Sequence, residues 1–395
     1  MQAHKMGGID LTAEEISRYA RHLTLPEIGI VGQKHLKASS VLCIGSGGLG
    51  SPILLYLAAA GIGNIGIVDF DSVEDSNLQR QVLHGMSWIG KPKIDSARAR
   101  ILEINPHCQV DTFLTRLSPH NALDIIQKFD IVCDCTDNFP SRYLINDACV
   151  ILGKPNIYGS VSRFEGQATV FNLNKESPNY RDLIPEPPPP GLLPSCSEGG
   201  VIGVLPGLIG IIQATEAIKI ITGVGTTLSG RLLVFDALKM SFRELTLRPS
   251  IKRQQIDKLI DYQEFCGSRE YSNSKSESLD IDSISVLELS KLLGRENEEI
   301  ILLDVRNQSE HDLISIPQSK LIPLKDIENG EAIENIRKMI KGKQLYVHCK
   351  SGKRSLKALS LLKRHNIQGT NIAGGIDAWI SKKLSNNLNH KKASD

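Results

Sequence analysis

Long apolar segments are missing from this sequence. No uninterrupted apolar run reaches the ~20 residues that a membrane-spanning helix needs. The most apolar stretch, residues 201–224, is interrupted by Gln213, Glu216 and Lys219, so we expect a buried or interface helix there and no membrane partner. The N-terminal residues are not followed by an apolar segment, so we expect no secretory signal.

Paired cysteines and an excess of one charge are also missing. The eight cysteines are scattered over 395 residues, which is typical of reduced thiols in a cytoplasm rather than of a disulfide framework. Lysine and arginine number 46 and aspartate and glutamate 44, so a net charge of +2 points to no nucleic-acid partner. With 41% hydrophobic and 23% charged residues, the chain is ordinary globular sequence.

The pattern of apolar residues predicts two α/β domains. Residues 10–248 alternate short apolar strands with helical segments, which favours a Rossmann-like nucleotide-binding domain with a mixed, mostly parallel sheet. The polar, serine-rich sequence that follows predicts a linker over residues 249–283. The α/β pattern resumes over residues 284–385 as a smaller domain, and residues 386–395 form a polar tail.

The first domain contains a glycine-rich loop between a predicted strand, residues 41–45, and a predicted helix, residues 52–60. Gly45, Gly47 and Gly50 fit the pattern G-x-G-x-x-G, and Gly48 lies within it. Such glycines let backbone N–H groups approach a phosphate at a helix N-terminus. Asp69 ends the next predicted strand, where it can bind ribose hydroxyls. A tight turn that only packs the helix against the strand is the alternative.

Charged residues downstream favour a nucleoside triphosphate. Arg80 and Lys93 can neutralise the charge that develops as pyrophosphate leaves. Asp137 and Asn138 follow a strand predicted over residues 129–135, at the sheet edge where ligands bind, and a carboxylate there can hold Mg²⁺ through water. A nicotinamide-dependent oxidoreductase needs no such cations, but the glycine loop and Asp69 keep it as an alternative. A non-catalytic ATP-binding scaffold is a second alternative.

Six motifs in order resemble the MoeB/ThiF family, ubiquitin-activating-like enzymes that adenylate the C-terminal glycine of sulfur carrier proteins. The resemblance covers residues 11–247. The motifs are Arg18-Tyr-Ala-Arg21, GSGGLGSP, DFDSVEDSNLQRQ, GKPK, DCTDN and Ser195-Cys196-Ser-Glu-Gly-Gly. The resemblance implies that ATP and Mg²⁺ are the cofactors and that a ubiquitin-like carrier with a C-terminal Gly-Gly is the partner.

The glycine loop and the resemblance together define a candidate nucleotide site. Its residues are Gly45, Gly47, Gly48, Asp69, Asp71, Asn77, Arg80, Gln81, Lys93, Asp137 and Asn138. Among these, Arg80 and Lys93 are expected to stabilise phosphate charge and Asp137 to hold Mg²⁺. The resemblance also implies that Arg21 crosses a dimer interface to reach the partner's ATP, and hence a homodimer; without it, Arg21 would be interpreted as a surface charge.

Cys196 is a candidate for a chemical role in this domain. Cys196 lies in a polar segment where an exposed thiol can act as a nucleophile, but some members of the family use this cysteine and others work without it, so both roles stay open.

Most relatives also hold a structural zinc between two C-x-x-C pairs. Here the expected positions contain Asn179, Asp182, Cys266 and Arg269, so we expect no structural zinc.

The second domain has its own reactive cysteine. Cys349 ends a predicted strand and is followed by Lys350, Lys353 and Arg354 before a predicted helix. A loop of N–H groups, a helix N-terminus and nearby cations all favour a thiolate, so Cys349 is the candidate nucleophile. An incidental loop cysteine is the alternative.

This loop resembles the rhodanese domain over residues 284–384. Asp304-Val-Arg306 and Gly374-Gly-Ile-Asp-Ala-Trp379 support the resemblance. Cysteine phosphatases use a similar loop that is one residue longer, so the shorter spacing from Cys349 to Arg354 favours sulfur carriage. Residues 314–319 read Ile-Ser-Ile-Pro-Gln-Ser, where rhodaneses usually have Gly-His-Ile-Pro-Gly-Ala, a departure that affects the expected local packing.

The two resemblances together predict a cytoplasmic adenylyltransferase and sulfurtransferase. The first module would adenylate a carrier of the MoaD/ThiS type. The second would carry sulfur as a persulfide on Cys349, received from a donor such as a cysteine desulfurase, and leave a thiocarboxylate on the carrier. Molybdenum cofactor biosynthesis is the expected pathway, with thiamine biosynthesis or tRNA thiolation as other outlets.

Overall fold

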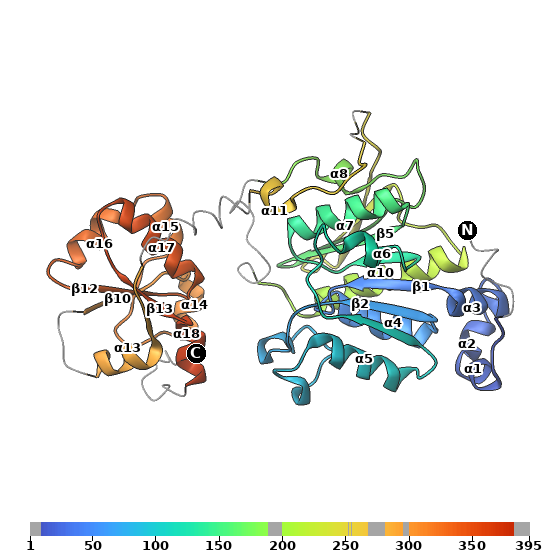
Figure 1. Cartoon of the computed structure of the whole chain (residues 1–395), viewed down its shortest axis with the longest axis horizontal. Helices are drawn as coiled ribbons and strands as arrows, with labels where there is room; N and C mark the ends of the chain where they lie inside the picture. Colours follow the sequence, from blue (N-terminus) through green and yellow to red (C-terminus); the bar gives the residue numbers. More distant parts are fainter. Residues whose placement is uncertain are drawn as a thin grey trace. The chain divides into compact units, whose positions relative to one another are not determined.

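The computed structural model describes residues 9–188, 200–251, 253, 255–267, 281–294 and 300–382. The chain divides into two compact units, residues 1–271 and residues 272–395, each with its own sheet (Figure 1). The expectation of an α/β fold with a mostly parallel first sheet is therefore confirmed.

The first unit is built on an eight-stranded sheet with the order β3-β2-β1-β4-β5-β6-β7-β8. Its strands are β1 (Ser40–Ile44), β2 (Asn64–Val68), β3 (Gln109–Phe113), β4 (Ile131–Asp134), β5 (Asn156–Ser162), β6 (Glu165–Phe171), β7 (Arg231–Asp236) and β8 (Ser241–Thr246). The first five run parallel, and β6, β7 and β8 add antiparallel pairs. The strand order reverses between β1 and β4, which is where ligands bind in open α/β sheets.

Helices cover both faces of this sheet. They are α1 (Ala13–Arg18), α2 (Ala20–Leu23), α3 (Gly29–Ala38), α4 (Gly50–Ala60), α5 (Lys93–Ile104), α6 (Ala122–Ile126), α7 (Phe139–Leu152), α8 (Tyr180–Leu183), α10 (Val204–Thr222) and α11 (Tyr262–Phe265). Short 3₁₀ segments, η1 (Asp75–Asn77) and η2 (Met86–Trp88), follow β2. Residues of α3, α4, α5 and α10 share one core cluster, and residues of α6, α7 and α11 share the other.

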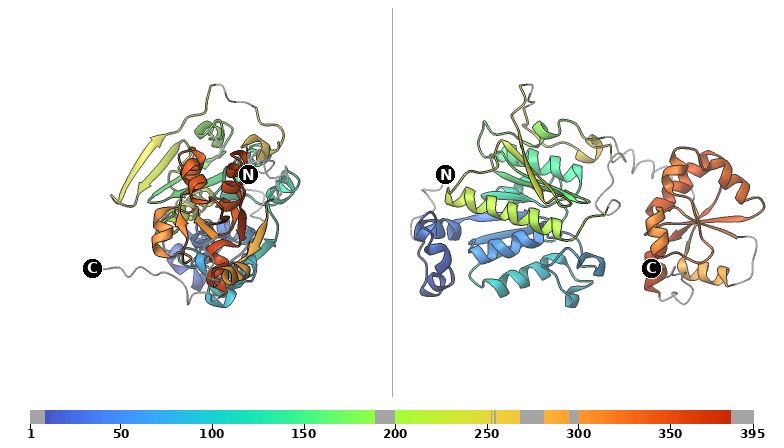
Figure 2. Two further views of the ribbon diagram at one scale, coloured as in Figure 1. Left: turned by 90° about the vertical axis from the view of Figure 1, so that its left-hand side faces the viewer. Right: turned by 180° about the vertical axis from the view of Figure 1, so that it is seen from behind.

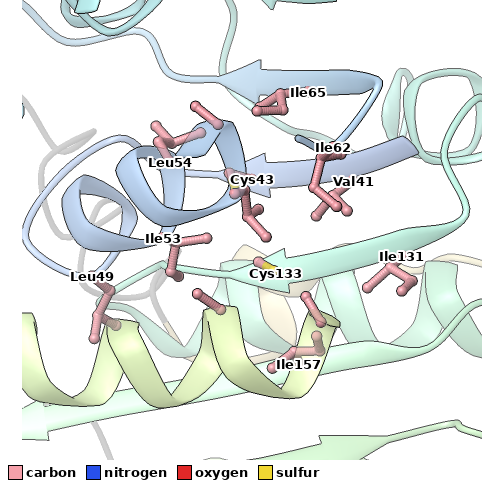
Figure 3. Packing of buried hydrophobic residues seen from close by; sticks show 14 of the residues in the cluster. Val41, Cys43, Leu49, Ile53, Leu54, Ile62, Ile65, Ile131, Cys133 and Ile157 are labelled. Carbon is pink, nitrogen blue, oxygen red and sulfur yellow. The ribbon is translucent and has the colours of Figure 1, made fainter. Parts of the chain in front are cut away.

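Alternation along the strands explains the two cores. In β1, Val41 and Cys43 belong to the cluster shown in Figure 3, whereas Leu42 and Ile44 belong to the cluster on the opposite face. Successive side chains of a strand point to opposite faces, so a strand buried on both faces needs a continuous apolar run. That run is the reason why the sequence predicts β1.

Helix α10 coincides with the apolar stretch in which we expect a buried or interface helix. By length and composition alone it could cross a membrane, with a mean hydropathy of 1.6, but half of its apolar window is buried inside the protein. It packs against α4, β5 and β6. In this structure α10 is a core helix of the first unit.

Part of the expected linker also packs on the first unit. Helix α11 lies against α7, and Tyr262 and Cys266 are buried in the core beside it. Periodicity did not indicate these residues because α11 has only four residues, too few to show a helical repeat.

The second unit has a five-stranded parallel sheet with the order β11-β10-β12-β13-β9. Its strands are β9 (Ser283–Ser285), β10 (Ile300–Asp304), β11 (Lys320–Leu321), β12 (Gln344–His348) and β13 (Thr370–Ala373). Its helices are α13 (Val286–Leu293), α14 (Gln308–Leu313), α15 (Leu324–Glu328), α16 (Ile333–Met339), α17 (Lys353–Arg364) and α18 (Gly375–Ser381). Helices α16 and α17 share one core cluster and α13 and α18 the other, so this sheet too is covered on both faces (Figure 2).

Candidate functional site

The glycine loop, residues 45–50, joins β1 to α4 where the strand order reverses. Its ends are so close that a Cβ on Gly50 would lie 2.1 Å from the carbonyl oxygen of Gly45, so only glycine fits there. Among the described residues, no acceptor takes the backbone N–H groups of Gly47 and Gly48. Unpaired N–H groups at a helix N-terminus attract anions. The loop therefore has the geometry of a phosphate-binding site.

Asp69, at the end of β2, fixes this loop. Its Oδ2 accepts hydrogen bonds from the backbone N–H of Ser46, at 2.8 Å, and from the Ser46 hydroxyl, at 2.9 Å. Its Oδ1 accepts one from the N–H of Asp71 at 2.9 Å. An ionised carboxylate has about four lone-pair sites, so Asp69 can hold the loop and still accept a ribose hydroxyl.

His84, which is not among the predicted site residues, also contacts this loop. Its Nε2 lies 3.0 Å from the carbonyl oxygen of Ser46, and its Nδ1 lies 3.0 Å from the hydroxyl of Ser96 on α5. Burial lowers the pKa of His84, and the charge of Lys93 acts in the same direction. The imidazole is therefore neutral at neutral pH. Thirty-eight residues separate His84 from Ser46, and no local pattern marks the pair.

Predicted cations and amides lie near the glycine loop. A Cβ on Gly48 would lie 3.8 Å from Cγ of Arg80, and one on Gly47 would lie 3.5 Å from Nε2 of Gln81. Arg80 donates to the carbonyl of Ser76 at 3.1 Å and makes no ion pair within the described parts of the chain. The guanidinium is therefore available to an anion.

Three other predicted residues are already engaged in hydrogen bonds. Lys93, buried at the start of α5, lies with its Nζ 3.2 Å from Oδ2 of Asp71, whose side chain is half exposed. Asn77 is buried at the end of η1, and its Oδ1 accepts the N–H of Glu74 at 3.2 Å. A phosphate would therefore compete with Asp71 for Lys93, whereas Asn77 shapes the segment that leads to Arg80.

The segment after β4 meets the glycine loop. A Cβ on Gly45 would lie 3.1 Å from the carbonyl oxygen of Cys135, so the two loops are in contact. Asp137 is exposed, and its Oδ1 accepts only a 3.3 Å hydrogen bond from Nδ2 of Asn138 among the described residues. Asn138 caps α7 by accepting the N–H of Ser141 at 3.0 Å. Asp137 lies two residues after this contact, and an exposed carboxylate can hold a hydrated Mg²⁺.

Buried charges support the same segment. Oδ1 of Asp134 accepts the N–H and the hydroxyl of Thr136, at 2.9 and 2.7 Å, and burial raises the pKa of Asp134. Arg142 donates to the carbonyl of Thr136 at 3.2 Å and to the hydroxyl of Ser160 on β5 at 3.0 Å. These contacts fix the backbone that presents Asp137. Neither Asp134 nor Arg142 was among the predicted site residues.

One predicted residue, Arg21, is not brought to this site, and another, Cys196, cannot be placed relative to it. Arg21 is exposed on α2, which packs against α1 and α3, and no hydrogen bond or ion pair joins its side chain to the glycine loop, although both lie in the described part of the chain. Cys196 lies in residues 189–199, outside the described residues.

In the second unit, Cys349 lies just after β12, at the base of a loop that leads into α17. Its Sγ accepts a hydrogen bond from the N–H of Gly352 at 3.1 Å, and the hydroxyl of Ser355 lies 3.5 Å away. Ser355 also lies 2.7 Å from Oδ1 of Asn371 on β13. Because a hydroxyl has one proton and Asn371 is the nearer acceptor, the N–H of Gly352 is the donor directed at the sulfur, and such a donor stabilises negative charge there. The geometry therefore suits a nucleophilic Cys349.

The start of helix α18 donates hydrogen bonds to this loop. The N–H groups of Ile376 and Asp377 donate to the carbonyls of Cys349 and Lys350, at 2.9 and 3.1 Å. A Cβ on Gly375 would lie 2.3 Å from the carbonyl oxygen of Cys349, so the close approach needs glycine. The motif Gly374–Trp379 thus acts by positioning the cysteine loop.

Arg354 and Arg306, two arginines of this unit, form bidentate ion pairs. Nη1 and Nη2 of Arg354 each donate to Glu310 on α14 at 2.7 Å. Burial opposes ionisation of Glu310, but the hydrogen bonds from Arg354 outweigh it and lower the pKa of that carboxyl. Arg306 pairs with Asp304 in the core, with Nε–Oδ2 and Nη2–Oδ2 distances of 2.9 and 2.6 Å. The motif Asp304-Val-Arg306 is therefore structural, and Arg354 reaches an anion only in competition with Glu310.

Known protein families match both units. Residues 19–255 match the ThiF family, and residues 285–382 match the rhodanese-like domain. The chain belongs to the ThiF family. It is 47% identical over 378 residues to "Probable adenylyltransferase/sulfurtransferase MoeZ" of Mycobacterium tuberculosis, covering 94% of each chain. It is 41% identical over 399 residues to "Adenylyltransferase and sulfurtransferase MOCS3" of Sus scrofa, covering 94% of this chain and 87% of that protein.

Solved structures share the fold of this ThiF-family chain. Escherichia coli MccB, in its complex with AMPCPP and MccA, superposes with a TM-score of 0.55 at 19% identity, covering 64% of this chain and 76% of MccB. PaaA superposes with a TM-score of 0.51 at 24% identity, covering 63% and 79%. At these identities the likeness concerns the fold alone.

The residues at the expected zinc positions do not fit zinc. Oδ2 of Asp182 accepts the N–H of Asn179 at 2.8 Å and Nη2 of Arg253 at 2.7 Å, and its Oδ1 accepts the N–H of Ser250 at 2.8 Å. Burial raises the pKa of Cys266 to about 11, which disfavours the thiolate that zinc needs. Among the described residues, no three His, Cys, Asp or Glu side chains are grouped to hold a metal; Arg269 lies outside them.

Ion pairs connect the segments of this region. Besides the Asp182–Arg253 pair, Arg181 donates to both carboxylate oxygens of Asp147 on α7, at 2.9 and 2.7 Å. The hydroxyl of Tyr262 donates to the same carboxylate at 2.7 Å. Asp147 thereby joins α8 to α11. We call these two ion pairs and Tyr262 the polar clamp.

Proposed function

We propose that this chain adenylates the C-terminal glycine of a ubiquitin-like sulfur carrier protein and then transfers sulfur to it. The observation that supports this most directly is that one chain carries both a glycine loop and a cysteine whose sulfur accepts a hydrogen bond. The loop has the geometry of a phosphate-binding site, and its Gly47 and Gly48 N–H groups have no acceptor among the described residues. Relatives that cover nearly the whole chain are named for both activities. We extend those activities to this protein.

The first module would perform the adenylation. The carrier's carboxylate oxygen attacks the α-phosphorus of ATP, the bond between the α-phosphorus and the bridging oxygen breaks, and pyrophosphate leaves. The glycine loop would bind phosphate oxygens through Gly47 and Gly48, and Arg80 and Lys93 would stabilise the departing charge. Mg²⁺, held by Asp137, would offset the charge of the phosphates.

The second module would supply the sulfur. Cys349, carrying a persulfide, attacks the acyl carbon of the adenylate, and AMP leaves. The product is an acyl disulfide between carrier and Cys349. A thiol reductant then supplies two electrons, which releases the carrier thiocarboxylate and restores the cysteine. A protein persulfide, such as that of a cysteine desulfurase, would load Cys349. Cys196 is a candidate for an additional thiol step.

The proposed assembly is a cytoplasmic homodimer in molybdenum cofactor biosynthesis, with thiamine biosynthesis or tRNA thiolation as other outlets. A reducing compartment suits the seven described cysteines, all of which are free. The exposed Arg21 would complete the partner's nucleotide site. Mixing Arg21→Ala and Arg80→Ala chains tests this, because a mixed dimer would regain one intact site; a mixture no more active than its components would contradict it.

The experiment that tests the function is ATP–pyrophosphate exchange with each candidate carrier from the same genome. We expect exchange that needs both the carrier and Mg²⁺. If ATP binds but no carrier supports exchange, the chain is a scaffold. If a nicotinamide cofactor binds without Mg²⁺, the chain is an oxidoreductase. Either result would overturn the proposal.

A further inference from the structure

His84 is a buried, neutral side chain that no step of the proposed chemistry uses, yet it contacts the phosphate-binding loop directly. A carbonyl oxygen can only accept a hydrogen bond, so the 3.0 Å contact to the Ser46 carbonyl requires a proton on Nε2. In the neutral ring, Nδ1 then has a lone pair, which accepts the hydroxyl proton of Ser96 at 3.0 Å. The hydrogen bonds thus define both the tautomer and the orientation of the ring.

This contact controls the direction of the N–H group of Gly47. The carbonyl of Ser46 and the N–H of Gly47 belong to one peptide unit, which is planar and trans. They point in opposite directions, so a ring that holds the carbonyl directs the N–H of Gly47 away from His84. Among the described residues, that N–H has no acceptor. It is therefore free to donate to a phosphate.

Ser46 is held at every polar group it has. Its N–H and hydroxyl both donate to Asp69, and its carbonyl accepts from His84. The side chain is fully buried. Asp69 alone would leave the peptide between Ser46 and Gly47 free to rotate about its flanking bonds. The hydrogen bond from His84 removes that freedom before any ligand arrives, and such preorganisation strengthens binding.

We propose that His84 is a positioning residue for adenylation: it holds the Ser46 carbonyl so that the N–H of Gly47 is directed at the nucleotide phosphates. The inference rests on the proposed function, but it concerns ATP binding as well as turnover. The competing view is that His84 only fills the core between the glycine loop and α5, in which case any side chain of similar size would serve.

Two substitutions separate these views. His84→Gln places an amide donor near the former Nε2 and can still reach Ser46. His84→Asn places its amide near the former Nδ1, so it can reach Ser96 but not Ser46. We expect His84→Gln to stay within about threefold of the parent, and His84→Asn to raise the ATP KM and lower kcat/KM in pyrophosphate exchange by roughly tenfold to a hundredfold. His120→Asn, at an exposed histidine of the same unit, is the matched control.

Calorimetric titration with ATP keeps the test independent of the reaction. Ser96→Ala leaves the imidazole in place but removes the donor that orients it, so we expect about threefold to tenfold weaker ATP binding even if His84→Asn unfolds. Equal effects of His84→Gln and His84→Asn, or parental ATP binding in both His84→Asn and Ser96→Ala, would overturn the inference. A parent that binds ATP but shows no exchange overturns the proposed function, and the titrations still decide the role of His84.

Discussion

Removing the charge of Asp182 should destabilise the first unit strongly, because this carboxylate forms one of the two ion pairs of the polar clamp and accepts two backbone N–H groups as well. The side chain of Asp182 is 2% exposed and that of Arg253 is 27% exposed. In Asp182→Asn the guanidinium loses its buried partner, and the new amide would face two backbone N–H donors with one acceptor oxygen. Breaking a buried ion pair costs ~3–5 kcal/mol, and because water can reach Arg253 in part, we expect ~3 kcal/mol.

For a unit of this size, ~3 kcal/mol corresponds to a fall of roughly 6–12 °C in the unfolding midpoint. Differential scanning calorimetry of the full chain can measure this on the transition of the first unit, with that of the second unit as an internal reference. Glu244→Gln is the matched control, because it removes the 2.9 Å ion pair to Arg231 at an exposed site, where the loss is below ~1 kcal/mol.

The same preparation tests the expected absence of structural zinc. We expect far less than one zinc per chain by elemental analysis and no change in the midpoint on adding a strong chelator. Stoichiometric zinc that is lost together with the fold on chelation would contradict the expected absence of zinc. An unfolding midpoint of Asp182→Asn equal to that of Glu244→Gln would contradict the stabilising role of Asp182.

Two further predictions concern the two reactive centres, and a third concerns the stability of the second unit. Arg80→Ala should slow carrier-dependent pyrophosphate exchange by ~10²–10³ while sparing thiosulfate cleavage. Excess Mg²⁺ should partly restore exchange in Asp137→Ala but not in Arg80→Ala. An exchange rate of Arg80→Ala within about threefold of the parent would mean that Arg80 is only a surface cation. Cys349→Ala should abolish thiosulfate sulfurtransferase activity and leave exchange intact, and loss of both would contradict separate modules. Burial lowers the pKa of His348 to about 4. Between pH 7 and pH 5 the unfolded chain therefore takes up a proton at this residue that the folded chain does not, and the second unit should lose about 2 kcal/mol of stability. The loss of stability over the same pH range should be smaller in His348→Asn.

The parts of the fold that the sequence predicts are those in which neighbouring residues share one environment. β1 and β4 are buried on both faces, and each therefore has a short continuous apolar run. The antiparallel strands were harder to predict: five of the six residues of β8 are exposed, so this strand has no such run. α11 is too short to show a period. Both are formed through contacts with distant segments, which a local pattern does not contain.

In the candidate sites, too, contiguous segments could be predicted and contacts between distant segments could not. The glycine loop and the Cys349 loop could be predicted because each is a contiguous segment whose residue types are needed for backbone reasons. Their supports could not be: His84 is 38 residues from Ser46, and Glu310 is 44 residues from Arg354. Arg354 was expected to favour a thiolate at Cys349, but in the structure its guanidinium pairs with the carboxylate of Glu310.

Both reactive loops are held in one physical way. In the first unit, the imidazole of His84 donates to the Ser46 carbonyl; in the second, the N–H groups at the start of α18 donate to the carbonyls of Cys349 and Lys350. In a trans peptide, a carbonyl held on one side directs the next N–H to the other side. Each loop therefore directs N–H groups away from its support without any cation being required. It follows that substitutions behind these loops should weaken ATP binding or sulfur transfer even though they touch no substrate.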